Sequence, residues 1–100
     1  MRQAEYQWPV PPDHPAFAGH FPGRPILPGV VLLDRALLLA ETFLGRRVSG
    51  WQIGQTKFFV PVAPGTFLHY LFQEQAGGRI AFSVRAAERE VAAGLLQANP

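Results

Sequence analysis

Prolines are concentrated in one short part of this 100-residue chain, and they restrict its fold more than any other feature does. Seven of the ten prolines lie between Pro9 and Pro28. Each proline ring fixes φ and removes a backbone donor, so we expect no helix over residues 11–28. A segment of about 18 residues is longer than most loops of compact domains, and long ordered loops are usually functional. The prolines therefore predict a rigid functional loop.

This loop leads directly into an apolar stretch, VVLLDRALLLAETFL, which predicts a helix over residues 28–44. Pro28 suits the first helical position, where its missing N–H has no partner. Gly45 suits the left-handed residue that follows the last turn. Four residues interrupt the apolar stretch: Asp34, Arg35, Glu41 and Thr42. Because the helix is apolar nearly all round, we expect it to be buried on every side.

The rest of the chain is rich in aromatic, β-branched and alternating apolar residues, as strands are. Strands are predicted close to five segments: residues 4–10, 51–60, 66–75, 80–84 and 91–95. Gly77-Gly78 predicts a two-residue hairpin, and a further turn is expected at residues 87–90. The pattern indicates an α+β chain with a single domain over residues 1–100. An antiparallel sheet of four or five strands is expected to wrap one long central helix.

Composition excludes several classes of function. Cysteine is absent, which excludes disulfides, thiolate catalysis and cysteine-ligated zinc. The net charge of +2 is spread along the chain and is too weak to indicate nucleic-acid binding. No apolar run reaches the roughly 18 residues of a membrane span. The first residues carry charges and prolines where a signal peptide needs an apolar run, so we expect a cytoplasmic protein.

Charged residues are scarce, at 16% of the chain against roughly 25% in ordinary soluble domains. A small domain has a large surface to cover with polar groups. This shortage predicts that part of the surface is buried against another subunit.

Asp34 is the first candidate for chemistry, because it lies in the middle of the apolar helix. Burial of a carboxylate is costly and raises its pKa, which favours a role as general acid near neutral pH. The structural alternative is a carboxylate that pairs with Arg35 or caps a neighbouring backbone group.

His20 lies in the proline-rich loop, where flanking glycine and proline residues can hold its imidazole in one direction. The alternative is an ordinary packed or solvent-facing histidine, and this ordinary interpretation is the one we give to His14 and His69. Gly29 is the third candidate, since its N–H at the helix start has no intrahelical partner and can polarise a carbonyl oxygen. Its alternative is a simple hinge between loop and helix. A base, an acid and an electrophilic N–H together suit proton abstraction next to a carbonyl, followed by loss of a β-substituent.

These residues lie in a run that resembles a known signature. Residues 17–30, FAGHFPGRPILPGV, are similar to the signature of the FabA/FabZ 3-hydroxyacyl-[acyl-carrier-protein] dehydratases. The flanking sequences VPPDHP (residues 10–15) and VVLLD (residues 30–34) look closest to the short ApeI-like branch. Residues 57–65 and 80–84 match the family more loosely.

The resemblance implies the hotdog fold and a homodimer or larger homo-oligomer. It implies an active site at the dimer interface, where the histidine of one subunit faces the acid of the other. It implies dehydration of (3R)-3-hydroxyacyl thioesters to trans-2-enoyl thioesters, in fatty-acid or aryl-polyene-type biosynthesis. It also implies acyl carrier protein as partner and no metal or organic cofactor, since phosphopantetheine carries the substrate.

Carried over by position, His20 is the base, Asp34 the acid that expels the hydroxyl, and Gly29 the donor to the thioester carbonyl. We expect three further residues to contact the substrate: Phe21, Pro28 and Val30. Four arginines are candidates for contact with the acidic carrier protein: Arg24, Arg46, Arg47 and Arg79. An ordinary solvated surface is the alternative for these arginines.

Some positions depart from the family pattern. Arg35 replaces the small or aromatic residue expected after the acid, and it could pair with Asp34 and weaken it as a donor. Leu38 replaces a glutamine that FabZ-type enzymes often carry, and Val30 replaces a cysteine of the bifunctional branch, which disfavours isomerisation. Two alternatives to a dehydratase stay open: a hotdog acyl thioesterase, and a non-catalytic acyl-binding or partner subunit.

Overall fold

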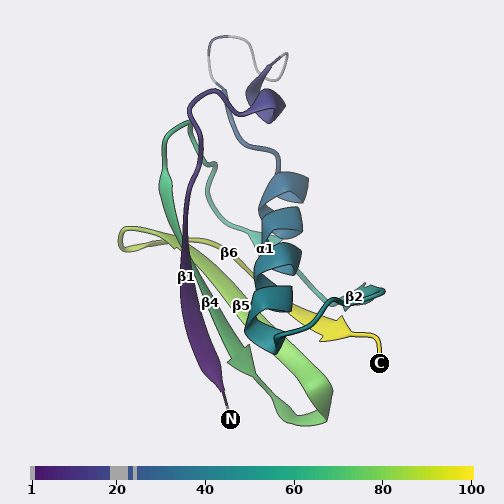
Figure 1. The fold of residues 1–100 in the computed structure, drawn as a ribbon. Helices are drawn as coiled ribbons and strands as arrows, with labels where there is room; N and C mark the ends of the chain where they lie inside the picture. The colour runs from purple at the N-terminus through teal and green to yellow at the C-terminus, as the bar shows by residue number, and fades with distance from the viewer. Residues whose placement is uncertain (1, 19–22, 24) are drawn as a thin grey trace.

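One helix lies across one face of an antiparallel sheet in the computed structural model, which describes residues 2–18, 23 and 25–100 (Figure 1). The elements in chain order are β1 (Gln3–Pro9), the 3-10 helix η1 (Pro15–Phe17), α1 (Gly29–Leu44), β2 (Trp51–Ile53), β3 (Lys57–Phe58), β4 (Phe67–Glu74), the 3-10 helix η2 (Ala76–Gly78), β5 (Arg79–Ala86) and β6 (Arg89–Ala98). The strand order is β1-β4-β5-β6-β2, with β3 also paired to β6, and all these pairs are antiparallel. The predicted architecture is confirmed, although the sheet has six strands and not four or five.

The ends of helix α1 follow from two residues, with one correction. Pro28 is the N-cap and not the first helical residue, so the helix begins at Gly29, one residue later than predicted. At the other end, Gly45 has the left-handed conformation (φ 73°), and its N–H donates to the carbonyl of Glu41. A residue with a β-carbon is strained in this conformation, which is why glycine ends the helix here.

Helix α1 buries only one of its faces, so the expectation of burial on every side is wrong for this chain. Its buried residues repeat every three or four positions: Leu32, Ala36, Ala40 and Phe43. The opposite face is exposed, and its residues repeat every four positions: Val30, Asp34, Leu38 and Thr42. Val30 and Leu38 are 72% and 50% exposed although they are apolar. The helix is apolar on both sides, but its own sheet covers only one.

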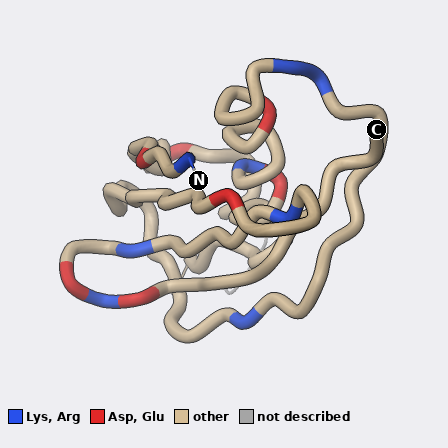
Figure 2. Tube along the Cα trace, turned by 90° about the horizontal axis from the view of Figure 1, so that it is seen from below, with Lys and Arg blue, Asp and Glu red and all other residues tan. Residues whose placement is uncertain are grey.

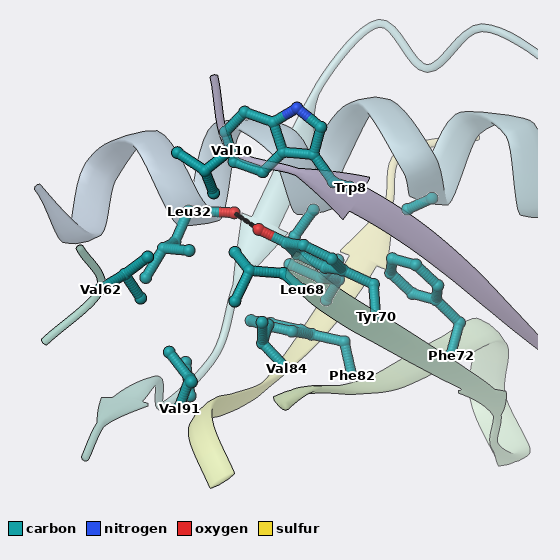
Figure 3. Close-up of a cluster of buried hydrophobic side chains, with 14 of the residues drawn as sticks. Trp8, Val10, Leu32, Val62, Leu68, Tyr70, Phe72, Phe82, Val84 and Val91 are labelled. Carbon is teal, nitrogen blue, oxygen red and sulfur yellow. Dashed lines mark hydrogen bonds between the residues drawn. The ribbon is translucent and has the colours of Figure 1, made fainter. Parts of the chain in front are cut away.

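The core between helix and sheet is built on aromatic residues of β4 (Figure 3). Tyr70 is fully buried, and its hydroxyl donates a hydrogen bond of 3.0 Å to the carbonyl oxygen of Leu32 in α1. Phe72 stacks against Phe43 of the helix, with ring centroids 5.9 Å apart. These contacts fix the helix along its length against β4.

Three local predictions need correction. The strand expected over residues 51–60 is divided into β2 and β3. Both pair with β6, but the register shifts by one residue between the pairs Ile53–Leu96 and Lys57–Ala93. The glycine turn is a three-residue 3-10 turn, Ala76–Gly78, and not a two-residue hairpin. The segment 11–28 does contain a helical turn, η1, because Pro15 occupies its first position, where no N–H donor is needed.

Within the described part of the chain, the single α-helix is too short to cross a membrane.

The buried Tyr70 hydroxyl generates a prediction about alkaline pH. Burial raises the pKa of this hydroxyl far above its usual value of 10, although the nearby Arg35 charge acts in the opposite direction. The unfolded chain releases the proton near pH 10 while the folded chain retains it, so the free energy of unfolding falls as the pH rises above about 10. Compared with Tyr70→Phe, the unmodified chain should lose up to about 1.4 kcal/mol more per pH unit in this range.

Urea unfolding between pH 8 and 11 measures this difference. Tyr6→Phe is the control, since Tyr6 is only half-buried and its hydroxyl makes no hydrogen bond to another described residue. If the free energy of unfolding falls with pH at the same rate in the unmodified chain and in Tyr70→Phe, the account is contradicted.

Candidate functional site

Gly29 presents a backbone donor at the start of helix α1. In the first turn, the amides of Val31 and Leu32 both donate to the carbonyl of Pro28, at 3.0 and 3.4 Å. The Gly29 amide donates to none of the residues that the structure describes. It lies at the positive end of the helix dipole, so it is suited to bind a carbonyl oxygen or another partly negative atom.

An apolar hollow of about 360 Å³ opens beside this amide. Its walls come from the segment before the helix, from the helix start and from the chain around β3: Ile26, Leu27, Gly29, Leu32, Phe58, Phe59, Val60 and Pro61. A second hollow of about 290 Å³ shares Ile26 and Pro61 with it and extends toward Pro25 and Pro64. The Leu27 amide donates to the carbonyl of Val62 at 2.8 Å, which joins the two walls.

Phe58 lies directly against Gly29. A β-carbon built on Gly29 would be 3.0 Å from Cζ of the Phe58 ring, closer than such atoms normally approach. The absence of a β-carbon at Gly29 therefore leaves room for the Phe58 ring. Phe58 and Phe59 are nonetheless about half exposed, at 49% and 48%.

Asp34 is on a different face of the helix from Gly29. Successive residues of an α-helix turn by about 100°, so five residues separate the two positions by about 140° around the axis. Asp34 belongs to the exposed face, which contradicts the expectation that its carboxylate is buried. Gly29 lines the hollow, whereas Asp34 of the same chain does not.

Arg35 does not pair with Asp34. Its guanidinium carbon lies 4.5 Å from the centroid of the Trp8 ring in a cation–π contact, and no ion pair links Arg35 to any residue in the described ranges. Neighbouring residues on a helix do not face each other, so the predicted pairing is disfavoured by geometry. Among the described residues, Asp34 therefore forms no ion pair.

The remaining predicted residues are placed as follows. His20 and Phe21 lie outside the described residues. Pro28 caps the helix, and Val30 is exposed on the face that carries Asp34, so neither lines the hollow. His69 is a strand residue whose ring Nδ1 lies 3.2 Å from a carboxylate oxygen of Glu5 on the neighbouring strand, as expected for a histidine without a catalytic role.

Lysine and arginine residues lie at several separate places along the described trace (Figure 2). Arg24 lies outside the described residues. Arg46 and Arg47 follow the C-terminal end of the 16-residue helix, about 24 Å from its start, and Arg46 donates to the carbonyl of Asn99. Arg79 is exposed at the start of β5.

Sequence reasoning missed the part of the site that comes from residues 58–61. The sequence pattern predicts a strand at Phe58 and Phe59 and assigns neither residue to a site. Two consecutive aromatic residues cannot both point into the core from one strand, because side chains alternate between its faces. This pattern was the available signal that one of them serves another surface.

Comparison with known proteins assigns this chain to a family. Residues 1–95 match the model of the family described as ApeI-like, ApeI dehydratase. Curated relatives named 3-hydroxyacyl-[acyl-carrier-protein] dehydratase FabZ include one from Zymomonas mobilis, 42% identical over 56% of this chain and 41% of the relative. Another, from Bartonella quintana, is 32% identical over 87% of this chain and 67% of the relative. The chain thus spans between two fifths and about two thirds of the length of these two relatives.

Solved structures agree with the predicted fold. "The Dehydratase Heterocomplex ApeI:P from Xenorhabdus doucetiae" matches with a TM-score of 0.80 and 28% identity, over 95% of this chain and 85% of that one. The dehydratase domain of PpsC from Mycobacterium tuberculosis matches with a TM-score of 0.77 over 98% of this chain and 39% of that one. At 19% identity the second likeness shows the fold alone. The fold is the hotdog fold, as predicted.

The close approach of Phe58 to Gly29 predicts the effect of a single methyl group. Gly29→Ala should lower the free energy of unfolding by about 1 kcal/mol, because the added carbon displaces the Phe58 ring. In a Phe58→Ala background the same change should be neutral or slightly stabilising, since alanine favours the helix more than glycine does. Urea unfolding of the four proteins of this cycle measures the difference, and an equal cost in both backgrounds would contradict the contact.

Proposed function

Because this chain belongs to the ApeI-like dehydratase family, we propose that it removes water from (3R)-3-hydroxyacyl thioesters carried on acyl carrier protein, giving trans-2-enoyl thioesters. The observation that carries the proposal is the amide of Gly29, which donates to no described residue and belongs to a residue that lines an apolar hollow. The amide suits a thioester carbonyl, and the hollow suits an alkyl or aryl chain. The names of the FabZ relatives support the same reaction.

The proposed reaction assigns one task to each residue. The Gly29 N–H donates to the thioester oxygen and stabilises the negative charge that develops there. The imidazole of His20 takes the α-proton, and the electron pair of that C–H bond forms the new double bond. Asp34 in its acid form donates a proton to the β-hydroxyl, whose C–O bond breaks to release water. Exchange with solvent returns the proton from His20 and restores the acid.

Two chains are needed for this arrangement, and we propose that they form a homodimer. Asp34 and Gly29 lie on different faces of one helix, so the carboxylate that meets a given Gly29 comes from the other chain. The face around Asp34 suits burial, because Val30 and Leu38 on either side of it are apolar and exposed. Covering this face also accounts for the scarcity of charged residues.

A second candidate is a subunit that works in a mixed assembly. The solved structure from Xenorhabdus doucetiae is described as a heterocomplex, and this chain matches it over 95% of its length. In such an assembly a different hotdog chain would cover the helix face around Asp34. This candidate predicts turnover only when the second chain is supplied.

The acyl carrier protein is the proposed partner, and no metal or organic cofactor takes part. The names of the FabZ relatives support this partner. Arg46 and Arg47 lie at the far end of the helix from Gly29, so we propose that the carrier docks without them. Lys57 is exposed next to Phe58 and is the cation we propose to meet the acidic carrier.

The test incubates the protein with a 3-hydroxyacyl carrier-protein thioester and detects turnover by the absorbance of the enoyl product. His20→Ala should abolish turnover, and Asp34→Asn should lower kcat by about 100-fold or more, because it keeps the size of the side chain but removes the acid. His69→Ala is the matched control and should keep full activity, since His69 contacts Glu5 away from Gly29. Full activity of His20→Ala, or release of free thiol in place of an enoyl product, would contradict the proposal.

A further inference from the structure

The tip of the Phe58 ring fills the space beside Gly29. Three ring atoms, Cζ, Cε1 and Cε2, lie 3.0, 3.1 and 3.2 Å from the point that a β-carbon on Gly29 would occupy. Carbon atoms in ordinary contact are about 3.5–4.0 Å apart. A methyl group immediately beside Gly29 therefore has no room while the ring keeps this place.

The sheet holds the ring in this position. Phe58 pairs with Ala92 of β6, and the amide of Phe59 donates to the carbonyl of Val91 at 2.8 Å. Residues directly opposite each other in a sheet project to the same face, and the small side chain of the buried Ala92 leaves space there for the ring. The backbone that carries Phe58 is thus fixed to β6, although the ring itself is 49% exposed.

Other walls of the hollow near Gly29 belong to the core. Leu27 and Leu32 line the hollow together with Phe58, but they are only 3% and 4% exposed. Close-packed core side chains do not move aside for a ligand without a cost in packing. Of these three side chains, only Phe58 can be changed without disturbing the core, so its size determines how much room there is beside Gly29.

Free apolar space continues from the hollow in another direction. The second hollow, of about 290 Å³, shares Ile26 and Pro61 with the first and continues toward Pro64, whereas Gly29 and Phe58 line only the first. An unbranched chain that starts at Gly29 can extend along this direction. A branch on the part of the chain next to Gly29 would instead compete with the ring for the same space.

We propose that Phe58 is a specificity-determining residue: its ring admits thioesters whose carbon 2, next to the carbonyl, is unbranched, and it excludes those that carry a methyl group on carbon 2. The inference rests on the proposed function, which places the thioester oxygen at the Gly29 amide. The amide nitrogen and the β-carbon position are both bonded to the same Cα, so a group held at this amide lies close to the ring.

The exclusion is one of shape and not of chemistry. A thioester with one methyl group on carbon 2 still has a proton there for a base to remove, so it can lose water in the same way. An apolar site distinguishes substrates that differ by one such carbon by about 10- to 200-fold.

Two substitutions remove the ring atoms that approach Gly29. Phe58→Leu lacks Cζ and both Cε atoms but keeps an apolar side chain in β3, and Phe58→Ala shortens the side chain further. Phe59→Ala is the matched control within the hollow, because Phe59 supplies none of the three atoms nearest to the β-carbon position of Gly29. Phe67→Ala is the control outside it, since Phe67 has almost the same exposure, 48%, and lies beside His69 on β4.

The first measurement is of binding alone. The probes are octanoyl-pantetheine and 2-methyloctanoyl-pantetheine, which carry no hydroxyl group to lose, and calorimetry gives the Kd of each. In the unmodified chain the branched probe should bind about 10-fold more weakly or worse. In Phe58→Leu and Phe58→Ala this difference should fall to about threefold or less, whereas Phe59→Ala and Phe67→Ala should keep it. An unchanged ratio in both Phe58 variants, or no binding of either probe to the unmodified chain, would overturn the proposal.

The second measurement compares kcat/KM for the carrier-protein thioesters of 3-hydroxyoctanoate and 2-methyl-3-hydroxyoctanoate. Both configurations at carbon 2 are tested, because only one of them leaves the proton that the base removes. Phe58→Leu should raise kcat/KM for the branched substrate relative to the linear one by about 10-fold, and Phe67→Ala should change neither value. The same ratio in Phe58→Leu and the unmodified enzyme would overturn the assignment to the ring. Selective binding of the linear probe without any enoyl product would count against the proposed function alone.

Discussion

The one-sided burial of helix α1 is the constraint on which the rest of the structure depends. The sheet packs against a face that includes two alanines, Ala36 and Ala40, both fully buried, and their small side chains let the helix lie close to the strands. Tyr70 and Phe72 of β4 anchor this face through a hydrogen bond and a stacked ring. In the described part of the chain, the opposite face of the helix is exposed. The helix has apolar residues on both faces, but the sheet covers only one of them. The hydrophobic core around the helix is therefore incomplete.

The same constraint separates the chemical groups. Gly29 lines the hollow beside Phe58, whereas Asp34 lies on the exposed face of the helix. On the proposed mechanism, a second chain covers the exposed helix face and also supplies the carboxylate that acts with Gly29. Stability and catalysis would then have a common origin, because the surface that needs burial is also the surface that carries the acid.

Much of this structure was predictable from local sequence, and the failures have clear physical causes. Gly45 marked the end of the helix because only a left-handed residue suits that position. The apolar pattern could not show that Val30 and Leu38 face outward, since burial by the same chain and burial by a partner require the same residues. The contact of Phe58 with Gly29 depends on how the chain returns along β6, and no local pattern encodes it. The hydrogen bond from the Ala16 amide to Nδ1 of His14, by contrast, spans two residues, and the sequence His-Pro-Ala could have indicated it.

The central claim is that two copies of this chain share each active site, and complementation tests it most directly. His20→Ala and Asp34→Asn are each expected to lack activity, and the two proteins are mixed under conditions that allow their subunits to exchange. If the histidine and the acid of a site come from different chains, half of the mixed dimers contain both variants, and each of these has one intact site. The mixture should then regain about a quarter of the activity of the unmodified enzyme. If exchange is complete and the mixture stays as inactive as its components, the two residues do not act across an interface between chains, and the account is wrong.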